Sequence, residues 1–355
     1  MRGRPRLGQA SGSLMSVRVR CEVSADRRLN LTSARAALYG WLFARHAGGQ
    51  FFLQLIGDRA SPVCDELRFL GLDWDLEIED CPAEISHVFG APGKASAPYV
   101  PLPAIEGSEA GIEIREWIGR GYAGLALANC LARLGWSPRG KRALLTLDEL
   151  AARFELGRVS HRPVRFDREH PDWFNRRWLG GLDADEIAAL LVPHWQAEYG
   201  RADRSEGTAL SPAAWQQTLA WAVREELDRP EQAVKKARFA FLDELALDST
   251  FQAALDQPYA EPILRAFVRE LPVVEPLNFD PLDAFCRELR LRFKETLGIR
   301  SRDVMCVLRA ALTGREDGPC LVVVCQLLGP ARCIQRAKNA ILTASSPVCA
   351  QRRKD

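Results

Sequence analysis

The stretch VRVRCEVSADRRLNLTSARAALYGWLFARHAGGQFFLQLIG, residues 17–57, decides the fold. Apolar and polar residues alternate through residues 17–23, which predicts a strand with one buried face. Apolar residues recur at helical spacing through residues 34–49, and two glycines end that helix. A short apolar strand follows at residues 50–57. The order strand, helix, strand predicts parallel strands joined by a right-handed crossover.

The next segments extend this pattern and then weaken it. Thr32 or Ser33 is expected to cap the first helix, and Ser61 with Pro62 to begin a second one. Proline, glycine, alanine and serine dominate residues 79–98, which predicts a loop or linker. Three candidate strands make a small sheet, and the third, at residues 99–106, contains prolines that limit it to an edge or an end.

Helical patterns occupy the rest of the chain. Thr146 with Glu149, and Asp183 with Glu186, have the spacing of capping boxes. The predicted fold class is therefore an α/β Rossmann-like N-terminal domain with a reduced parallel sheet, followed by an all-α region. Residues 1–16 and 343–355 are expected to be disordered, with domains at 17–110, 111–228 and 229–342.

The composition restricts the possible functions. The formal net charge of the 355 residues is +2, so no overall basic field demands a nucleic acid, and a DNA partner is not expected. No apolar run reaches the ~20 residues of a membrane span, and the N-terminus lacks the apolar core of a secretory signal. The ten cysteines form no Cys-x-x-Cys pair, and neither they nor the histidines have metal-site spacing. We expect free thiols, no metal and a cytoplasmic location.

Six collinear segments carry a family resemblance: VRVR, ARAALYGWLFARHAGG, LGLDWD (70–75), NCLARLGWSP (129–138), DWFN (172–175) and LRAALTGREDGP (308–319). Together they resemble bacterial glutamyl-tRNA synthetases, which are class I aminoacyl-tRNA ligases. The resemblance covers roughly residues 17–75 and 99–342. It implies that residues 111–228 form a stem-contact region and that residues 229–342 form an anticodon-binding-like domain.

The resemblance also implies a substrate pocket, of which this sequence keeps only part. Arg20, Ser24 and Arg35 match family positions around the amino-acid substrate. The family's His-x-Gly-Gly or His-x-Gly-His ATP signature is replaced by residues Asn30, Leu31, Thr32 and Ser33. Signature glycines let the backbone approach ATP, and the histidine helps to stabilise charge on its phosphates.

Two larger departures accompany that replacement. The family's second ATP signature supplies lysines, but no lysine occurs between Lys94 and Lys141. The family also inserts an acceptor-binding domain between the halves of the sheet, and here residues 75–99 are too few for a domain. These departures together favour a pseudoenzyme that forms no glutamyl-adenylate and needs no cofactor, with no catalytic residue assigned.

The helical part suggests what such a protein would retain, which is tRNA binding, alone or beside a protein partner such as an active synthetase. The candidate phosphate contacts are basic residues: Arg139, Lys141, Arg142, Arg176, Arg177, Lys235 and Lys236. A divergent ligase or transferase that acts on glutamate or tRNA remains an alternative, with ATP and Mg²⁺ as its cofactors. A protein-interaction scaffold without tRNA binding is the third reading.

Overall fold

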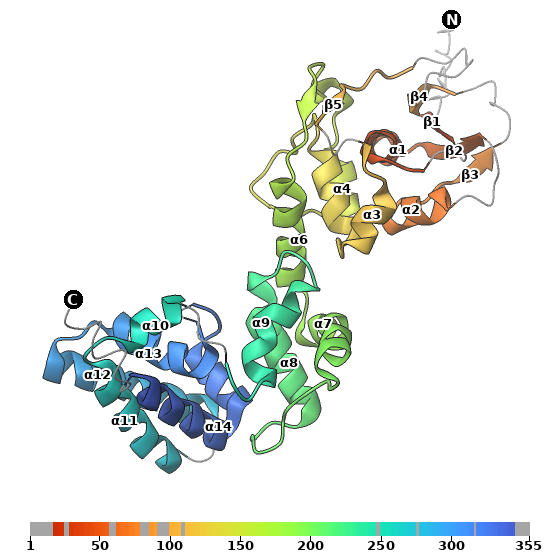
Figure 1. Cartoon of the computed structure of the whole chain (residues 1–355). Helices are drawn as coiled ribbons and strands as arrows, with labels where there is room; N and C mark the ends of the chain where they lie inside the picture. Colours follow the sequence, from red (N-terminus) through yellow and green to blue (C-terminus); the bar gives the residue numbers. More distant parts are fainter. Residues whose placement is uncertain are drawn as a thin grey trace, which may run out of the picture. The chain divides into compact units, whose positions relative to one another are not determined.

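The computed structural model describes residues 17–24, 28–56, 62–78, 85–90, 99–107, 111–245, 249–274, 277–315 and 317–344. Residues 1–16 and most of the predicted C-terminal tail lie outside these ranges. Contacts divide the chain into two compact units, with the boundary between Trp178 and Leu179 (Figure 1). This boundary falls inside the predicted 111–228 region, and the three-part domain division stays a prediction.

A four-stranded sheet forms one layer of the first unit. Its strands are β1 (Arg18–Ser24), β2 (Gln50–Ile56), β3 (Leu76–Ile78) and β4 (His87–Gly90), in the order β3-β2-β1-β4. All three neighbouring pairs are parallel. Helix α1 (Leu31–His46) connects β1 to β2. The predicted parallel sheet, its first two strands and the crossover helix are confirmed.

Three details of the sequence prediction are wrong. Strand β4 lies inside the predicted linker 79–98, because the apolar pair Val88 and Phe89 is buried beside β1. Within residues 99–106, only Ile105–Glu106 forms a strand, β5. It pairs with β6 (Val164–Arg165) in a separate two-stranded sheet, so the region after residue 110 is not entirely helical.

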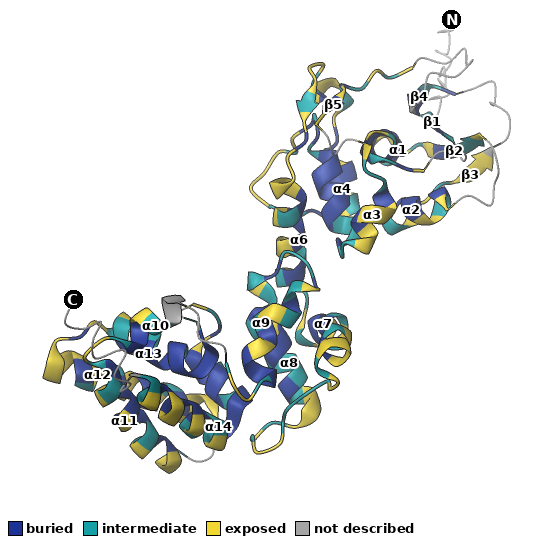
Figure 2. Ribbon diagram, viewed as in Figure 1, coloured by how far each residue is buried: buried dark blue, intermediate teal, exposed yellow. Residues whose placement is uncertain are grey.

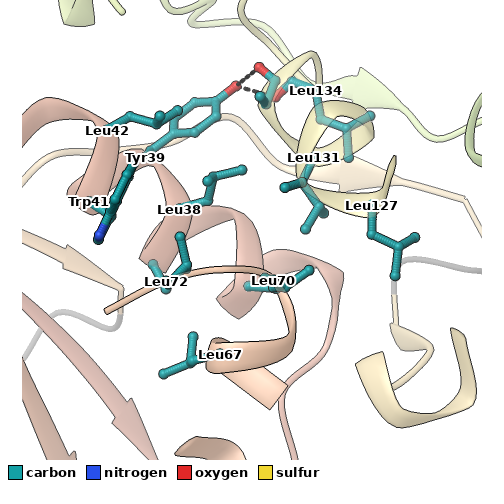
Figure 3. Packing of buried hydrophobic residues seen from close by; sticks show 14 of the residues in the cluster. Leu38, Tyr39, Trp41, Leu42, Leu67, Leu70, Leu72, Leu127, Leu131 and Leu134 are labelled. Carbon is teal, nitrogen blue, oxygen red and sulfur yellow. Dashed lines mark hydrogen bonds between the residues drawn. The ribbon is translucent and has the colours of Figure 1, made fainter. Parts of the chain in front are cut away.

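Helix α1 is the centre of the first unit's core. The sheet covers one of its sides, where Gly40 lets it approach closely: a Cβ there would lie 3.1 Å from the Phe51 ring and 3.3 Å from the Phe89 ring. Leucines from α2 (Val63–Phe69), α4 (Gly124–Ala132) and the segments after them surround Leu38 and Tyr39 (Figure 3). The Tyr39 hydroxyl donates to carbonyls of Ala132 and Leu134 at 3.1 and 2.9 Å. Burial of α1 therefore ties the sheet to α4.

The remaining helices of the first unit pack on this core. They are α3 (Ile114–Gly119) and α5 (Leu147–Arg153), followed by α6 (Glu169–Gly181), in which the unit boundary lies. The predicted capping box at the start of α5 is confirmed: Thr146 accepts from the Glu149 amide, and the Glu149 carboxylate accepts from the Thr146 amide.

The second unit, as described, consists of helices: α7 (Ala184–Tyr199), α8 (Pro212–Val223), α9 (Gln232–Phe241), α10 (Ser249–Leu255), α11 (Ala260–Glu270), α12 (Phe279–Leu297), α13 (Ser301–Thr313) and α14 (Leu321–Ala344). The predicted capping box of Asp183 and Glu186 begins α7. Figure 2 shows buried residues concentrated on α4 in the first unit and on α13 in the second, where most residues of each helix are buried. The predicted N-terminal sheet followed by helices is therefore confirmed.

Helix α14 holds the second unit together through two arginines. Arg336 is 5% exposed and donates to carbonyls of Leu312, Phe239 and Leu242. Arg332 donates to carbonyls of other segments, and burial lowers its pKa. The α14 backbone turns sharply at Gly329, where φ is 73° and a Cβ would lie 2.3 Å from the Gly207 carbonyl oxygen. Only glycine fits this turn without strain.

Within the described ranges, no helix has both the length and the apolar character to cross a membrane. The described cysteines, which exclude Cys81 and Cys349, are free thiols, and five of them are buried.

Replacing Leu38 tests the central role of α1. Leu38 is fully buried, so Leu38→Ala should lower the free energy of unfolding by about 2–5 kcal/mol. Leu76→Ala is the matched control, because Leu76 is 54% exposed, and a change within about 0.5 kcal/mol is expected. Urea unfolding followed by circular dichroism measures both. Equal losses in the two variants would contradict this account of the core.

Candidate functional site at the amino end of the first helix

The amino end of α1 is closed by its own side chains. Asn30 is the N-cap, with Oδ1 accepting from the Ser33 amide at 3.0 Å. The Ser33 hydroxyl oxygen accepts from the Asn30 amide at 3.0 Å, which completes a capping box. The predicted cap at Thr32 or Ser33 is therefore wrong by two or three residues. Thr32 is exposed in the first turn of the helix. Three of the replaced signature positions thus form an ordinary helix start.

A buried carboxylate lies directly beside this cap. Glu66 of α2 is 3% exposed, and its Oε2 accepts from the Leu29 amide at 3.2 Å. Burial raises the pKa of the Glu66 carboxyl above its usual value. The other oxygen, Oε1, has no hydrogen-bond partner within the described structure. A negative or strongly hydrogen-bonding group is therefore already present next to the helix end.

Glu113 places a second carboxylate at the same end. The Ile114 amide donates to the Leu29 carbonyl at 2.7 Å, which fixes the start of α3 against the segment before α1. Glu113 forms ion pairs with Arg28 at 3.6 Å and Arg115 at 2.7 Å. The arginine and glutamate charges offset one another, so the site is not a concentrated positive patch.

These contacts change what the helix end can bind. A helix amino terminus attracts anions through its free amides and its dipole. Here the Leu29 amide donates to Glu66, and the Asn30 and Ser33 amides donate to each other's side chains. An entering phosphate would meet carboxylates where it needs donors. The arrangement favours stabilisation of the fold over binding of a polyanion.

The retained residues on β1 lie in the sheet. Arg20 is 3% exposed, and its Nη2 lies 3.2 Å from Oε2 of Glu22, two residues along the same strand. Phe52 and Val88 are its partners on the neighbouring strands. Ser24 is half-buried at the carboxyl end of the strand. A role of Arg20 and Ser24 in substrate binding stays a prediction.

Arg35 connects α1 to two loops. It is 1% exposed, and it donates to the Leu134 carbonyl at 3.0 Å and to the Pro103 carbonyl. Burial lowers the pKa of its guanidinium, and the ring of Tyr39 lies 5.9 Å away. The contacts of Arg35 are to backbone oxygens, whereas Arg20 contacts a carboxylate in the sheet. The described contacts do not bring Arg20 and Arg35 together, and the substrate role of Arg35 is untested.

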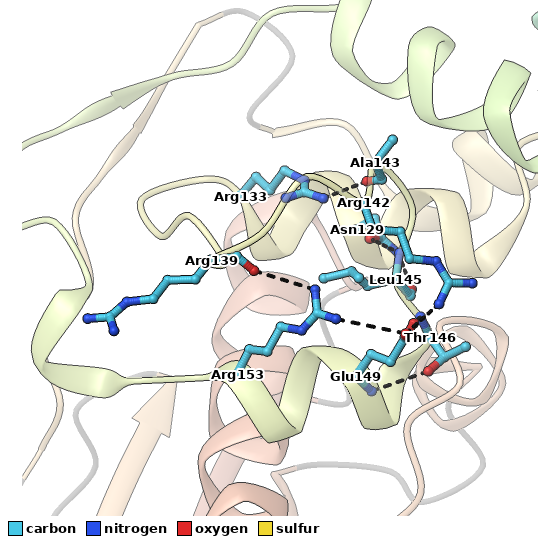
Figure 4. Close-up of polar contacts among 9 residues, drawn as sticks. All are labelled: Asn129, Arg133, Arg139, Arg142, Ala143, Leu145, Thr146, Glu149 and Arg153. Carbon is cyan, nitrogen blue, oxygen red and sulfur yellow. Dashed lines mark hydrogen bonds and ion pairs between the residues drawn. The ribbon is translucent and has the colours of Figure 1, made fainter.

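Two arginines of the basic loop at residues 139–142 have acidic neighbours, and Figure 4 shows one of these pairs, Arg142 with Glu149. Arg139 lies 3.8 Å from Glu155, and Arg142 pairs with Glu149. Both arginines remain mostly exposed, at 76% and 64% of the side chain. Lys141 is exposed, and no described residue forms an ion pair with it. This lysine is therefore the loop's most available cation.

The other predicted tRNA contacts differ in availability. Arg176 and Arg177 are exposed on α6, and Arg177 lies 5.4 Å from the ring centre of Trp173, itself 37% exposed. Lys235 is exposed on α9. Lys236 pairs at 2.9 Å with Glu226, which also binds an arginine. The position of Lys236 in this network indicates a structural contact.

Sequence reasoning missed three carboxylates at this site. Glu22 could have been found, because residues two apart on a strand share a face. Glu66 and Glu113 come from helix contacts across long sequence separations, which one sequence does not reveal. Within the described ranges no cluster of three histidine, cysteine or acidic residues could hold a metal ion.

Comparison with known proteins identifies relatives of this chain. Residues 186–341 match the model of the anticodon binding domain family. Glutamate–tRNA ligase of Bacillus subtilis is 30% identical over 228 residues, which is 64% of this chain and 45% of the relative. That of Thermosynechococcus vestitus is 31% identical over 216 residues, 61% of this chain and 43% of the relative. The chain spans less than half the length of these curated relatives.

Solved structures support the same fold. A glutamate tRNA ligase from Elizabethkingia meningosepticum, crystallised in complex with its amino acid, matches with a TM-score of 0.72 at 15% identity. The match covers 93% of this chain and all of that one. A glutamate-tRNA synthetase from Elizabethkingia anophelis matches with a TM-score of 0.68 at 16% identity. At these identities, the likeness is one of fold.

The buried carboxylate predicts a pH dependence of stability. Because the folded pKa of Glu66 is raised, the contribution of this carboxyl to the free energy of unfolding should fall as pH rises from the unfolded pKa to the folded one. Glu66→Gln keeps an acceptor for Leu29 and lacks this titration. Its stability relative to wild type should therefore increase with pH, by at most about 1.4 kcal/mol per pH unit. Urea unfolding between about pH 4 and pH 8 measures the difference.

The control is Asp65→Asn on the same helix, where the side chain is 83% exposed. A Glu66→Gln difference that depends on pH more strongly than this control identifies the buried carboxyl as its source. A Glu66→Gln difference that is no more pH-dependent than the control would show that the Glu66 carboxyl has no raised pKa in the folded protein.

Proposed function

Since this chain belongs to the glutamyl-tRNA synthetase family, we propose that it is a relative that forms no glutamyl-adenylate and retains a tRNA-binding role. It acts in the cytoplasm, either alone or beside a protein partner such as an active synthetase. The anticodon binding domain match at residues 186–341 supports the tRNA part of this proposal.

The observation that carries the first part is the closed amino end of α1. Asn30 and Ser33 satisfy each other's amides, and the Glu66 carboxyl accepts from the amide of Leu29. ATP would bring phosphates to an end where the amides of Leu29, Asn30 and Ser33 are already bonded and where Glu66 and Glu113 lie close. Among the described residues, these contacts reduce the donors and the positive charge that phosphoryl chemistry requires.

A second contact supports the loss of amino-acid binding. The buried Arg20 guanidinium is paired with the carboxylate of Glu22 on its own strand. A glutamate substrate would have to compete with this internal carboxylate for the same cation, although Nε and Nη2 of Arg20 form no hydrogen bond within the described residues. An internal pair holds an advantage because its two partners are fixed by one strand and lose less freedom on pairing than a free ligand.

The tRNA-binding part rests on exposed cations rather than on total charge. Lys141, Arg177 and Lys235 are exposed on three separate segments. Such side chains can follow a phosphate backbone without reading its bases. The basic residues in internal ion pairs, such as Lys236, would contribute less.

The alternative is a divergent ligase or transferase that acts on glutamate or tRNA, with ATP and Mg²⁺ as cofactors. Retention of Arg20, Ser24 and Arg35 favours it. A scaffold without tRNA binding is the third possibility. Adenylation and tRNA-binding measurements separate the three.

The adenylation test is ATP–pyrophosphate exchange with glutamate, in the presence and absence of tRNA. We expect no exchange above background, because the amides of Leu29, Asn30 and Ser33 are already bonded and two carboxyls lie beside them. An active bacterial glutamate–tRNA ligase, assayed in parallel, confirms that the reagents work. Robust exchange by this chain would overturn the proposal and support the divergent-ligase alternative.

The tRNA test is filter binding with total tRNA at about 50 and about 200 mM salt. We expect salt-sensitive binding, since phosphate contacts release counterions. Lys141→Glu and Lys235→Glu should each weaken binding and reduce the slope of log affinity against log salt by about one.

Arg68→Glu is the control, because Arg68 is exposed on α2 and is not among the candidate contacts. It should leave both affinity and slope unchanged. If the wild-type chain shows no salt-sensitive binding, the tRNA-binding proposal is wrong and a protein-interaction scaffold is favoured instead.

A further inference from the structure

Helices α11 and α14 of the second unit border an open hollow of about 470 Å³. Six residues line it, three aliphatic and three basic: Arg265, Val268, Arg269, Lys338, Ile341 and Leu342. We call this hollow, with its six lining residues, the α11/α14 groove. None of the six carries a carboxylate.

The floor of the groove is apolar and accessible to water. Leu342 is 72% exposed, although it is a large aliphatic residue close to the end of α14. Ile341 and Val268 are half-buried beside it. The lining residues span positions 265–269 of α11 and 338–342 of α14, so the groove is about one helical turn, or roughly 6 Å, long. An aliphatic patch of this length accommodates about one turn of a docked helix.

The edges of the groove are positively charged. Arg265 and Arg269 are four residues apart and form one stripe along α11. They pair with Glu261 at 2.8 Å and with Glu270 at 2.6 Å, but their side chains are 66% and 72% exposed. Such exposed pairs are weak and can be exchanged for another carboxylate.

The cation on the opposite edge is more available. Lys338 of α14 is exposed, and no described residue forms an ion pair with it. It lies one helical turn before Leu342, so positive charge and apolar surface alternate along α14 as well. Glu270 is also bound by Arg292 at 2.6 Å, which further reduces negative charge beside the groove.

We propose that the α11/α14 groove binds an acidic amphipathic helix of a protein partner. The partner's aliphatic side chains would cover Val268, Ile341 and Leu342. Its carboxylates, spaced three or four residues apart on both flanks, would meet Arg265, Arg269 and Lys338. The match rests on charge complementarity around an apolar floor, which is the usual composition of a helix-binding groove.

Nucleic acid fits the groove less well. Unpaired bases bind by stacking on aromatic rings, whereas the apolar lining residues here are all aliphatic. Phosphates need cations but gain nothing from an exposed leucine. The combination of aliphatic floor and basic edges therefore favours a protein segment over RNA.

The groove would be the surface through which the chain binds the protein partner of the proposed function. The inference rests on that function only because it expects such a partner. It does not depend on whether adenylation is lost or tRNA is bound. The exchange and filter-binding assays can fail while groove binding succeeds, and the reverse also holds.

The test uses the full chain and a fluorescent synthetic peptide of about four helical turns. The peptide carries leucines on one face and glutamates on both flanks; a control peptide has lysine at each glutamate position. Fluorescence anisotropy should detect binding of the acidic peptide alone. Lys338→Glu and Leu342→Asp should each raise its Kd at least about tenfold. Arg302→Glu, an exposed α13 position outside the groove, should not change it.

Circular dichroism and thermal melting confirm that each variant is folded. The proposal is overturned if the acidic peptide does not bind, or if the groove variants bind it as tightly as Arg302→Glu does. It is also overturned if Lys338→Glu and Leu342→Asp abolish binding of tRNA or of anionic phosphatidylserine vesicles while peptide binding persists. Those outcomes would assign the groove to RNA or to a membrane surface.

Discussion

The burial of helix α1 on nearly every side is the constraint on which the first unit depends. A helix covered by a sheet on one face and by α4 and α5 on others must satisfy its polar side chains internally. Arg35 and Tyr39 donate to backbone carbonyls at the end of α4 and in the loops at residues 103 and 134, although Nε of Arg35 has no partner among the described residues. The position of those loops is therefore coupled to α1, and a change in either disturbs both.

The packing of the body of α1 and the contacts at its amino end place different demands on the sequence. The body of α1 is shaped by packing, and its sequence remains recognisable. At the amino end of the helix, Leu29 and Leu31 are buried in the same core, whereas Thr32 is exposed and Asn30 and Ser33 are half-buried at its edge. Once Asn30 and Ser33 bond to each other and the Glu66 carboxyl accepts from Leu29, the helix end is stable without any ligand.

Short-range sequence patterns correctly predicted the elements that depend mainly on neighbouring residues. Strands β1 and β2, helix α1 and the caps at Thr146 and Asp183 follow from periodicity and spacing within a few residues. Strand β4 was missed because its four residues become a strand only by pairing with β1. The cap of α1 was misplaced because several good capping residues adjoin one another. Of the site carboxylates, Glu22 alone lay within reach of sequence reasoning, since the others arrive from distant helices.

Gly329 has a different significance, which concerns the fit between α14 and the backbone at residue 207. Its positive φ and its closeness to the Gly207 carbonyl leave no room for another residue, although it contributes no functional group. A side chain at this position would push the two segments apart, so the turn in α14 and the path of the chain at residue 207 constrain each other.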